Sequence, residues 1–334
     1  MTRAPTTIGI VGAGAWGTAL AMAAQRGGGE ATLWAFEAEV AEAINGGRGN
    51  PLYLPGAEID DGIRATTDLG DLAASVILLL AAPAQHLRRT VSGLSGSVSP
   101  ETSLVICSKG IEQETLALMS EAVAPLFPDN PLFVLSGPTF ASEVAAGLPT
   151  AITLAGSNLD AASTLADTLG SARFRPYASD DLVGAQIGGA VKNVLAIACG
   201  IAEGRGFGDN TRAALVTRGL AELTRLCVAK GGRAETMMGL SGLGDLVLTC
   251  TSKQSRNYSL GLALGEGRAL DEILSSSRSV AEGVFTASAA VQLAETLGID
   301  MPIAAAVDAV LNGNGRIDDV IEALLARPLR AETE

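Results

Sequence analysis

The feature that most constrains this chain is a glycine-rich turn set between an apolar run and an alanine-rich segment. Residues 7–11 form a β-branched run that predicts a strand, and residues 18–25 predict a helix. Between them, Gly12, Gly14 and Gly17 follow the spacing G-x-G-x-x-G. The first glycine permits a tight turn, the second lets a ligand approach the backbone, and the third allows the helix to pack closely on the strand. This order predicts the first unit of a doubly wound sheet.

A glycine turn that leads into a helix can also hold a pyrophosphate, because the free N–H groups of the helix N-terminus favour negative charge. The spacing alone is a weak signal in a chain with 40 glycines. Here, however, Glu37 lies 20 residues after Gly17 and follows a second predicted strand at residues 31–35. A carboxylate at this distance accepts hydrogen bonds from the ribose of a bound dinucleotide. The sequence therefore predicts a dinucleotide-binding turn.

Glu37 also bears on which dinucleotide is bound. Its charge repels a 2′-phosphate, and no Lys or Arg occurs in the segment 33–38. We therefore expect NAD to be preferred over NADP. The alternative is that Glu37 is only a solvated helix cap.

Further apolar runs alternate with helical stretches in the first half of the chain. Their spacing is typical of a parallel, doubly wound sheet, with strands at residues 75–80, 103–107, 132–135 and 151–155. From about residue 180, long segments rich in Ala, Leu and Val replace the strand-like runs. These segments predict helices at residues 181–203, 211–230, 258–265, 286–297 and 303–311.

These patterns predict an α/β Rossmann-type domain with a parallel sheet, followed by a mostly α-helical domain. We place the dinucleotide-binding domain at residues 1–180 and the helical substrate and catalytic domain at residues 181–326. The last residues, 327–334, are polar and are expected to form a flexible tail.

Composition excludes several classes of function. The formal net charge of −13 repels nucleic acid and anionic membranes, so we expect no nucleic-acid partner. The chain has one histidine, His86, and four scattered cysteines without CxxC spacing. Such a set does not predict a zinc site or a Ser/His/Asp triad, and we expect no metal.

The expected location follows from the apolar segments. The N-terminus lacks the apolar core of a signal peptide, and the apolar run around residues 76–82 is too short to span a bilayer. We therefore expect a cytoplasmic protein without membrane insertion. A homodimer is expected from its frequency among soluble oligomers.

Two lysines stand in unusual settings. Lys109 follows a predicted strand, at the edge where open α/β sheets bind ligands. Lys192 lies in an apolar helix, where burial is costly unless the ammonium is paired or its pKa falls. Either outcome suits proton transfer. The alternative is that Lys192 extends its ammonium to solvent, but Gly188 and Gly189 would let a cofactor or another backbone come close.

Five motifs resemble those of one enzyme family. They are GAGAWGTAL from Gly12, SKGI from Ser108, SGPTFASE from Ser136, GGAVKNVLAI from Gly188 and SGLGDLVLTCTSKQSRN from Ser241. Together, in this order and over nearly the whole chain, they resemble the bacterial NAD(P)-dependent sn-glycerol-3-phosphate dehydrogenases. These oxidoreductases reversibly reduce dihydroxyacetone phosphate to sn-glycerol 3-phosphate, a precursor for phospholipid biosynthesis. The resemblance thus implies NAD or NADP as cofactor and a small phosphorylated substrate.

The resemblance also assigns roles to individual residues. Lys192 matches the general acid/base, Asp245 the carboxylate near it, and Lys109 the lysine that contacts both substrate and nicotinamide. The other residues matched to the substrate site are Gly137, Thr139, Ser255, Arg256 and Asn257. On the cofactor side the matches are Ala15, Trp16, Phe36, Tyr53, Ala141, Arg256, Val280 and Glu282. At Phe36 many bacterial members have a basic residue or His, so the Phe-Glu pair resembles NAD-specific members.

Three other functions fit parts of the sequence. A related 3-hydroxyacid or ketopantoate dehydrogenase shares the two-domain plan, but would have little use for the run Ser255-Arg256-Asn257. A UDP-sugar dehydrogenase needs a catalytic Cys in a glycine-rich setting, which Cys250 lacks. A non-catalytic dinucleotide-binding regulator would not need the charged residues at 109, 192 and 245.

Overall fold

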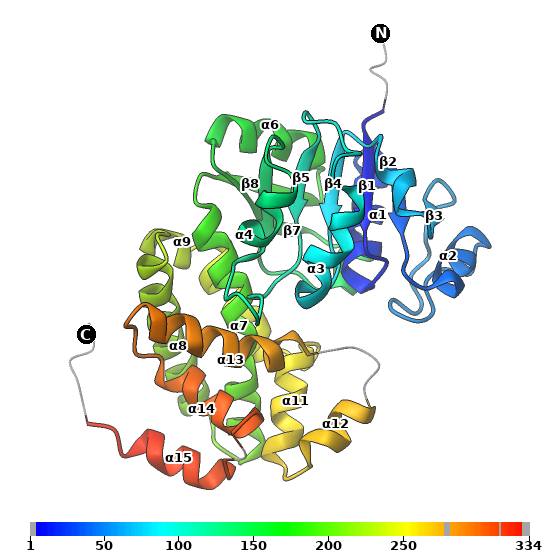
Figure 1. Cartoon of the computed structure of the whole chain (residues 1–334). Coiled ribbons are helices and arrows are strands. Elements are labelled where there is room, and N and C mark those ends of the chain that lie inside the picture. The colour runs from blue at the N-terminus through cyan, green and yellow to red at the C-terminus, as the bar shows by residue number, and fades with distance from the viewer. Residues whose placement is uncertain (1–4, 277–280, 314, 329–334) are drawn as a thin grey trace.

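The computed structural model describes residues 5–276, 281–313 and 315–328. The chain forms a sheet with helices on both faces, followed by a helical part, and α7 passes from one to the other (Figure 1). The strands are β1 Thr7–Val11, β2 Glu30–Trp34, β3 Arg64–Thr66, β4 Ile77–Leu80, β5 Ser103–Ile106, β6 Leu132–Ser136, β7 Thr150–Gly156 and β8 Phe174–Ser179. The helices between them are α1 Ala15–Arg26, α2 Ala38–Asn45, α3 Ala84–Val91, α4 Met119–Val123, α5 Ala141–Ala145 and α6 Leu159–Leu169.

Helices account for most of the second half. They are α7 Leu182–Gly204, α8 Asp209–Ala229, α9 Ala234–Met237, α10 Asp245–Thr251, α11 Arg256–Gly265, α12 Leu270–Ser276, α13 Glu282–Thr296, α14 Pro302–Leu311 and α15 Ile317–Leu325. The fold class expected from the sequence, a Rossmann-type sheet followed by helices, is confirmed. Whether residues 1–180 and 181–326 are separate domains stays a prediction.

The sheet differs from the expected one in one strand pair. Its order is β3-β2-β1-β4-β5-β6-β7-β8, and neighbours are parallel except β6 and β7, which are antiparallel. Only the five-residue α5 lies between these two strands, so the chain turns back along β6 instead of crossing over the sheet on a long helix. The sheet is therefore mostly parallel, as predicted, but the strand predicted at residues 151–155 runs antiparallel to its neighbour β6.

Two strands were not predicted. β3 has only three residues, and β8 contains Pro176, which removes a backbone donor and is tolerated because β8 lies at the edge of the sheet. Neither strand has the apolar run that identifies the central strands.

Both faces of the central strands are buried. In β4, Ile77 and Leu79 pack in the cluster that includes Leu20 of α1, while Leu78 and Leu80 pack in the cluster that includes Leu87 of α3. This double burial explains why the strands are continuous apolar runs without polar alternation. Helices therefore cover both faces of the sheet. A ligand can bind at the edge formed by the carboxyl ends of the strands.

The 23-residue helix α7 is the centre of the helical part. It packs against α8, α10, α11, α13 and α14, and most of its residues are buried. Among the described residues, it is the one helix long and apolar enough to cross a membrane, but 83% of its most apolar window lies inside the protein. We interpret it as a core helix.

Helix α11 crosses α7 in close backbone contact. A Cβ on Gly200 of α7 would lie 2.1 Å from the carbonyl oxygen of Tyr258, and a Cβ on Gly261 of α11 would lie 2.1 Å from that of Ile197. One turn farther along, Gly204 and Gly265 are similarly tight. Four glycines therefore set the separation of the two helices.

We expect Gly261→Ala to destabilise the protein, because its methyl group would have to displace the backbone of α7. Overpacking of a core typically costs about 1–3 kcal/mol, and a rigid backbone neighbour places this substitution at or above the upper end. Urea unfolding measures the change. The control is Gly208→Ala, where an added Cβ meets no atom within 4 Å and φ is −81°. Equal stability of the two variants would contradict the close crossing.

Candidate active site

The glycine turn follows β1 and opens α1, as the sequence predicted. A Cβ added to Gly17 would lie 1.8 Å from the carbonyl oxygen of Gly12, and a Cβ added to Gly12 would lie 2.9 Å from the backbone nitrogen of Ala82. The turn itself therefore requires both glycines. At Gly14, by contrast, an added Cβ would meet nothing within 4 Å. Packing of the protein therefore does not explain Gly14, whereas a ligand on the N-terminus of α1 would.

Asn50, which was not predicted, ties this turn to a neighbouring loop. Its side-chain amide donates to the carbonyl oxygen of Ala13 and to the hydroxyl of Thr18, both at 2.9 Å. Its Oδ1 accepts the backbone N–H of Tyr53 at 3.1 Å. Asn50 is buried, and an isolated Asn in a loop gave no sequence signal for this role.

Glu37 and Tyr53, both predicted cofactor residues, are in direct contact. The Tyr53 hydroxyl donates to Oε1 of Glu37 at 2.7 Å. Burial and the neighbouring carboxylate raise the pKa of Tyr53 to about 12, so its hydroxyl stays protonated. Glu37 precedes α2 at the capping position, but its side chain makes no capping hydrogen bond. The carboxylate is therefore held by Tyr53, and the alternative that it caps the helix is not supported.

The predicted cofactor residues have features that fit a dinucleotide. The indole N–H of Trp16 is buried without a protein partner, which is costly unless a ligand or water accepts it. Phe36 is 78% exposed, and its ring meets that of Trp34 edge-on at 6.4 Å between centroids. Ala15 and Ala141 are the first residues of α1 and α5, where backbone N–H groups are free. Val280 lies outside the described residues.

The two lysines share one carboxylate. Nζ of Lys109 donates to Oδ2 of Asp245 at 2.7 Å and to the Gly137 carbonyl at 3.1 Å. Nζ of Lys192 donates to the other oxygen, Oδ1. Asp245 is fully buried. The proximity of Lys192 and Asp245 implied by the resemblance is present, and the bridge to Lys109 is an additional finding.

Thr249, also not predicted to be functional, completes the surroundings of Lys192. Its hydroxyl accepts from Nζ of Lys192 at 2.9 Å and donates to the Asp245 carbonyl at 2.6 Å. It lies one turn after Asp245 on α10, which follows a π-helical turn over Leu240–Gly244. That turn fits against α7 because Gly188 has no side chain: a Cβ there would lie 2.2 Å from the Ser241 carbonyl oxygen.

Lys192 is 6% exposed, so the alternative that it extends its ammonium to solvent is wrong. Burial lowers its pKa to about 8; Asp245 opposes this change, and the positive charge of Lys109 adds to it. Near neutral pH the ammonium thus holds a proton that it can release and regain. The apolar helix predicted either pairing of the ammonium or a lowered pKa, and Lys192 has both.

The predicted phosphate-binding residues lie at the start of α11. The Ser255 hydroxyl caps the helix by accepting the Tyr258 N–H at 3.2 Å, which leaves its proton free to donate. Arg256 is the first helical residue and is exposed. Asn257 is buried, and its Oδ1 accepts the Gly283 N–H of α13 at 3.0 Å. The helix N-terminus and the guanidinium together form a surface suited to an anion.

The start of α13 links this surface to the lysine site. A Cβ on Gly283 would lie 2.7 Å from Oδ1 of Asn257 and 2.9 Å from the carbonyl oxygen of Asn193, the residue after Lys192. Beside it, burial raises the pKa of the Glu282 carboxyl, and the charges of Arg256 and the two lysines oppose this change. Thr139 lies near Lys109, since its hydroxyl donates at 3.3 Å to the same Gly137 carbonyl that accepts from Nζ of Lys109.

Comparison with known proteins decides the family. Residues 7–162 match the family model described as the N-terminus of NAD-dependent glycerol-3-phosphate dehydrogenase, and residues 181–322 match its C-terminus. A glycerol-3-phosphate dehydrogenase of the NAD(P)+ type from Parvibaculum lavamentivorans is 53% identical, and the alignment covers 100% of both chains. The chain belongs to the NAD-dependent glycerol-3-phosphate dehydrogenase family.

Other members of the glycerol-3-phosphate dehydrogenase family agree in sequence and structure. The enzyme of that name from Rhodospirillum rubrum is 56% identical over 97% of this chain and 93% of its own length. The crystal structure of glycerol-3-phosphate dehydrogenase from Coxiella burnetii superposes with a TM-score of 0.92 at 38% identity, covering 97% of this chain and 99% of the other. The family resemblance seen in the motifs therefore extends over the whole fold.

We predict that Glu37→Ser reduces the preference for NADH over NADPH, because it removes the charge that would repel a 2′-phosphate. One partly solvated charge is worth about 1 kcal/mol or less, so the ratio of the two dissociation constants should change at most about fivefold. Fluorescence titration with each cofactor gives this ratio. Tyr53→Phe is the control, because it removes the hydroxyl that holds Glu37 but keeps the charge. An unchanged ratio of dissociation constants in Glu37→Ser would show that this carboxylate does not discriminate between the two cofactors at the ribose.

Proposed function

We propose that this chain catalyses the reversible NAD(P)-dependent oxidation of sn-glycerol 3-phosphate to dihydroxyacetone phosphate, which supplies glycerol 3-phosphate for phospholipid synthesis. The observation that carries the proposal is the buried Lys192, which has a lowered pKa and is paired with the buried Asp245. Helix α13 packs between this pair and the N-terminus of α11, where Arg256 lies. Family membership supports the same activity.

Lys192 is the proposed general acid/base. When bound, the nicotinamide cofactor supplies the hydride that reduces the ketone carbon, and negative charge develops on the carbonyl oxygen. The Lys192 ammonium donates its proton to that oxygen, and in the oxidation direction the neutral amine removes it. Asp245 and Thr249 hold Nζ in place, so the site needs little rearrangement during the reaction.

Lys109 is the proposed second cation of the site. It is fixed by Asp245 and by the Gly137 carbonyl, with only a small part of its side chain exposed. Its charge stabilises a developing oxyanion nearby and lowers the pKa of Lys192. Lys109 therefore contributes charge, while Lys192 transfers the proton.

Ser255, Arg256 and Asn257 are proposed to bind the phosphate of the substrate. Binding energy from a group remote from the reacting carbon can position the carbonyl for reaction. No observation favours a 3-hydroxyacid or ketopantoate substrate, or a regulator without chemistry, over this activity. For the cofactor we propose NAD as the preferred partner, since Glu37 is held by Tyr53 and opposes a 2′-phosphate.

Location, assembly and domain limits are proposals as well. We propose a cytoplasmic homodimer. The net charge of −13 supports the absence of nucleic-acid binding, and the burial of α7 supports the absence of membrane insertion. We propose domains at residues 1–180 and 181–326. The tail predicted at 327–334 lies outside the described residues from 329 onward.

We expect NADH oxidation to be far faster with dihydroxyacetone phosphate than with dihydroxyacetone, because only the phosphate can bind Arg256. Losing a hydrogen bond to a charged group costs about 1.5–3 kcal/mol, so Arg256→Gln should lower kcat/KM for the phosphorylated ketone roughly 10- to 150-fold. Its kcat/KM with dihydroxyacetone should fall much less, because only the cofactor contact that the resemblance also assigns to Arg256 is then lost. Lys253→Gln, which removes a nearby exposed cation, is the control. Equal losses on both ketones would exclude Arg256 from the phosphate site.

A further inference from the structure

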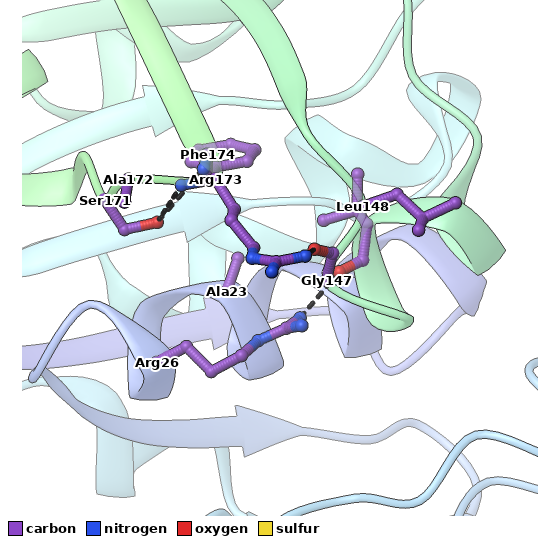
Figure 2. A pocket seen from close by; sticks show the side chains of 9 residues that line it. Ala23, Arg26, Gly147, Leu148, Ser171, Ala172, Arg173 and Phe174 are labelled. Atoms are coloured by element: carbon purple, nitrogen blue, oxygen red, sulfur yellow. Dashed lines mark hydrogen bonds between the residues drawn. The ribbon is translucent and has the colours of Figure 1, made fainter.

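A cavity lies beside the sheet, and its lining contains none of the lysine-site residues. Its volume is about 250 Å³, and it is lined by Ala23, Arg26, Val144, Gly147, Leu148, Ser171, Ala172, Arg173 and Phe174. These residues come from the end of α1, the end of α5 with the turn after it, and the segment that leads into β8. Arg173 and Arg26 extend from two sides toward the turn at Gly147 (Figure 2).

Main-chain carbonyls hold both guanidinium groups in place. Nε and Nη2 of Arg26 donate to the carbonyls of Met22 and Val144, at 3.0 and 2.6 Å. Nη1 of Arg173 donates to the carbonyl of Gly147 at 3.1 Å. Each guanidinium has five N–H donors, so several remain for a ligand. These contacts fix the two cations, and the carbonyl oxygens at the C-terminal ends of α1 and α5 offset part of their charge.

Neither arginine has an acidic partner in the part of the chain that the structure describes. The ion pairs found there involve other cations, although the protein carries an excess of 13 negative charges. Burial lowers the pKa of Arg26, and no carboxylate opposes that change. Two fixed positive charges at the border of one cavity favour an anionic ligand.

The rest of the lining is largely apolar. Ala23, Val144 and Phe174 are buried, and Leu148 extends along the opening with 47% of its surface exposed. A ligand that fits this lining has an apolar body as well as an anionic group. The volume is below the roughly 300–1,000 Å³ of sites for drug-sized ligands, which indicates a small molecule.

We propose that this cavity binds a small organic oxyanion, a phosphate monoester or a carboxylate with an apolar body, through Arg26 and Arg173. The site is separate from the cofactor turn, because α1 places Arg26 at the opposite end of a 12-residue helix, roughly 16 Å from Ala15. The ends of α1 and α5 that line the cavity lie opposite the ends that begin at the predicted cofactor residues Ala15 and Ala141.

The test is calorimetric titration of the full chain with phenyl phosphate, benzoate and, as a neutral control, benzyl alcohol. The Arg256→Gln background removes the proposed substrate-phosphate contact, and no turnover is measured, so this proposal and the proposed function can fail separately. We expect one of the two anions, or both, to bind with one site per chain, and benzyl alcohol to bind at least tenfold more weakly. The anion that binds more tightly identifies the preferred class.

Two variants in the Arg256→Gln background test whether the anion binds at this cavity. Arg173→Gln and Arg26→Gln should each weaken binding at least tenfold, and melting temperatures check that both fold. Arg89→Gln, which removes an exposed arginine of α3, should leave binding unchanged. Saturating NADH should leave the bound anion in place. Absence of anion binding, equal weakening by Arg89→Gln, unchanged binding in Arg173→Gln, or displacement by NADH would each overturn the proposal.

Discussion

Close backbone contact along α7 is the constraint on which the arrangement of the site depends. Gly188 lets the π-helical turn before Asp245 lie against the helix, and Gly200 lets α11 cross it at backbone distance. Lys192 lies between these two contacts. The glycines therefore fix where the carboxylate partner and the phosphate-binding helix stand relative to one lysine, and larger residues would displace both.

Burial of charge is the cost of this arrangement. Taking two ammonium groups and a carboxylate out of water is expensive, and mutual pairing offsets only part of the cost. Asp245 bridges Lys109 and Lys192, and the Thr249 hydroxyl supplies a further acceptor. The net positive charge that remains is suited to a ligand that brings or develops negative charge, which is what phosphate binding and ketone reduction require.

The sequence predicted the parts of the fold where one physical signal dominates. Central strands such as β4 are apolar on both faces and lie next to turn residues, so they were found within about two residues. The edge strand β8 was missed because Pro176 and exposed side chains remove that signal. The reversal at β7 was missed because strand direction depends on how the connecting segment packs, which a single sequence does not display.

The same distinction holds for the site. Short-range motifs predicted the positions of the glycine turn, Glu37 and the start of α11, because the geometry of these features depends on residues that are neighbours in sequence. The burial of Lys192 could not be decided from its apolar helix, since that depends on α10 and α13 packing over it. Asn50 had no signal, and Thr249 lay within the motif from Ser241 without an assigned role. Both make contacts with segments distant in sequence.

The most direct test of the account is the pH dependence of kcat/KM for reduction of dihydroxyacetone phosphate in wild type, Lys192→Ala and Lys109→Ala. This quantity reports ionisations of the free enzyme. Because the pKa of Lys192 is about 8 and its protonated form donates the proton, wild-type kcat/KM should fall as pH rises above about 8. Lys192→Ala should lose this ionisation and roughly 10²- to 10⁴-fold in kcat, while Lys109→Ala should keep the ionisation. An ionisation that survives in Lys192→Ala and vanishes in Lys109→Ala would contradict the account and assign proton transfer to Lys109.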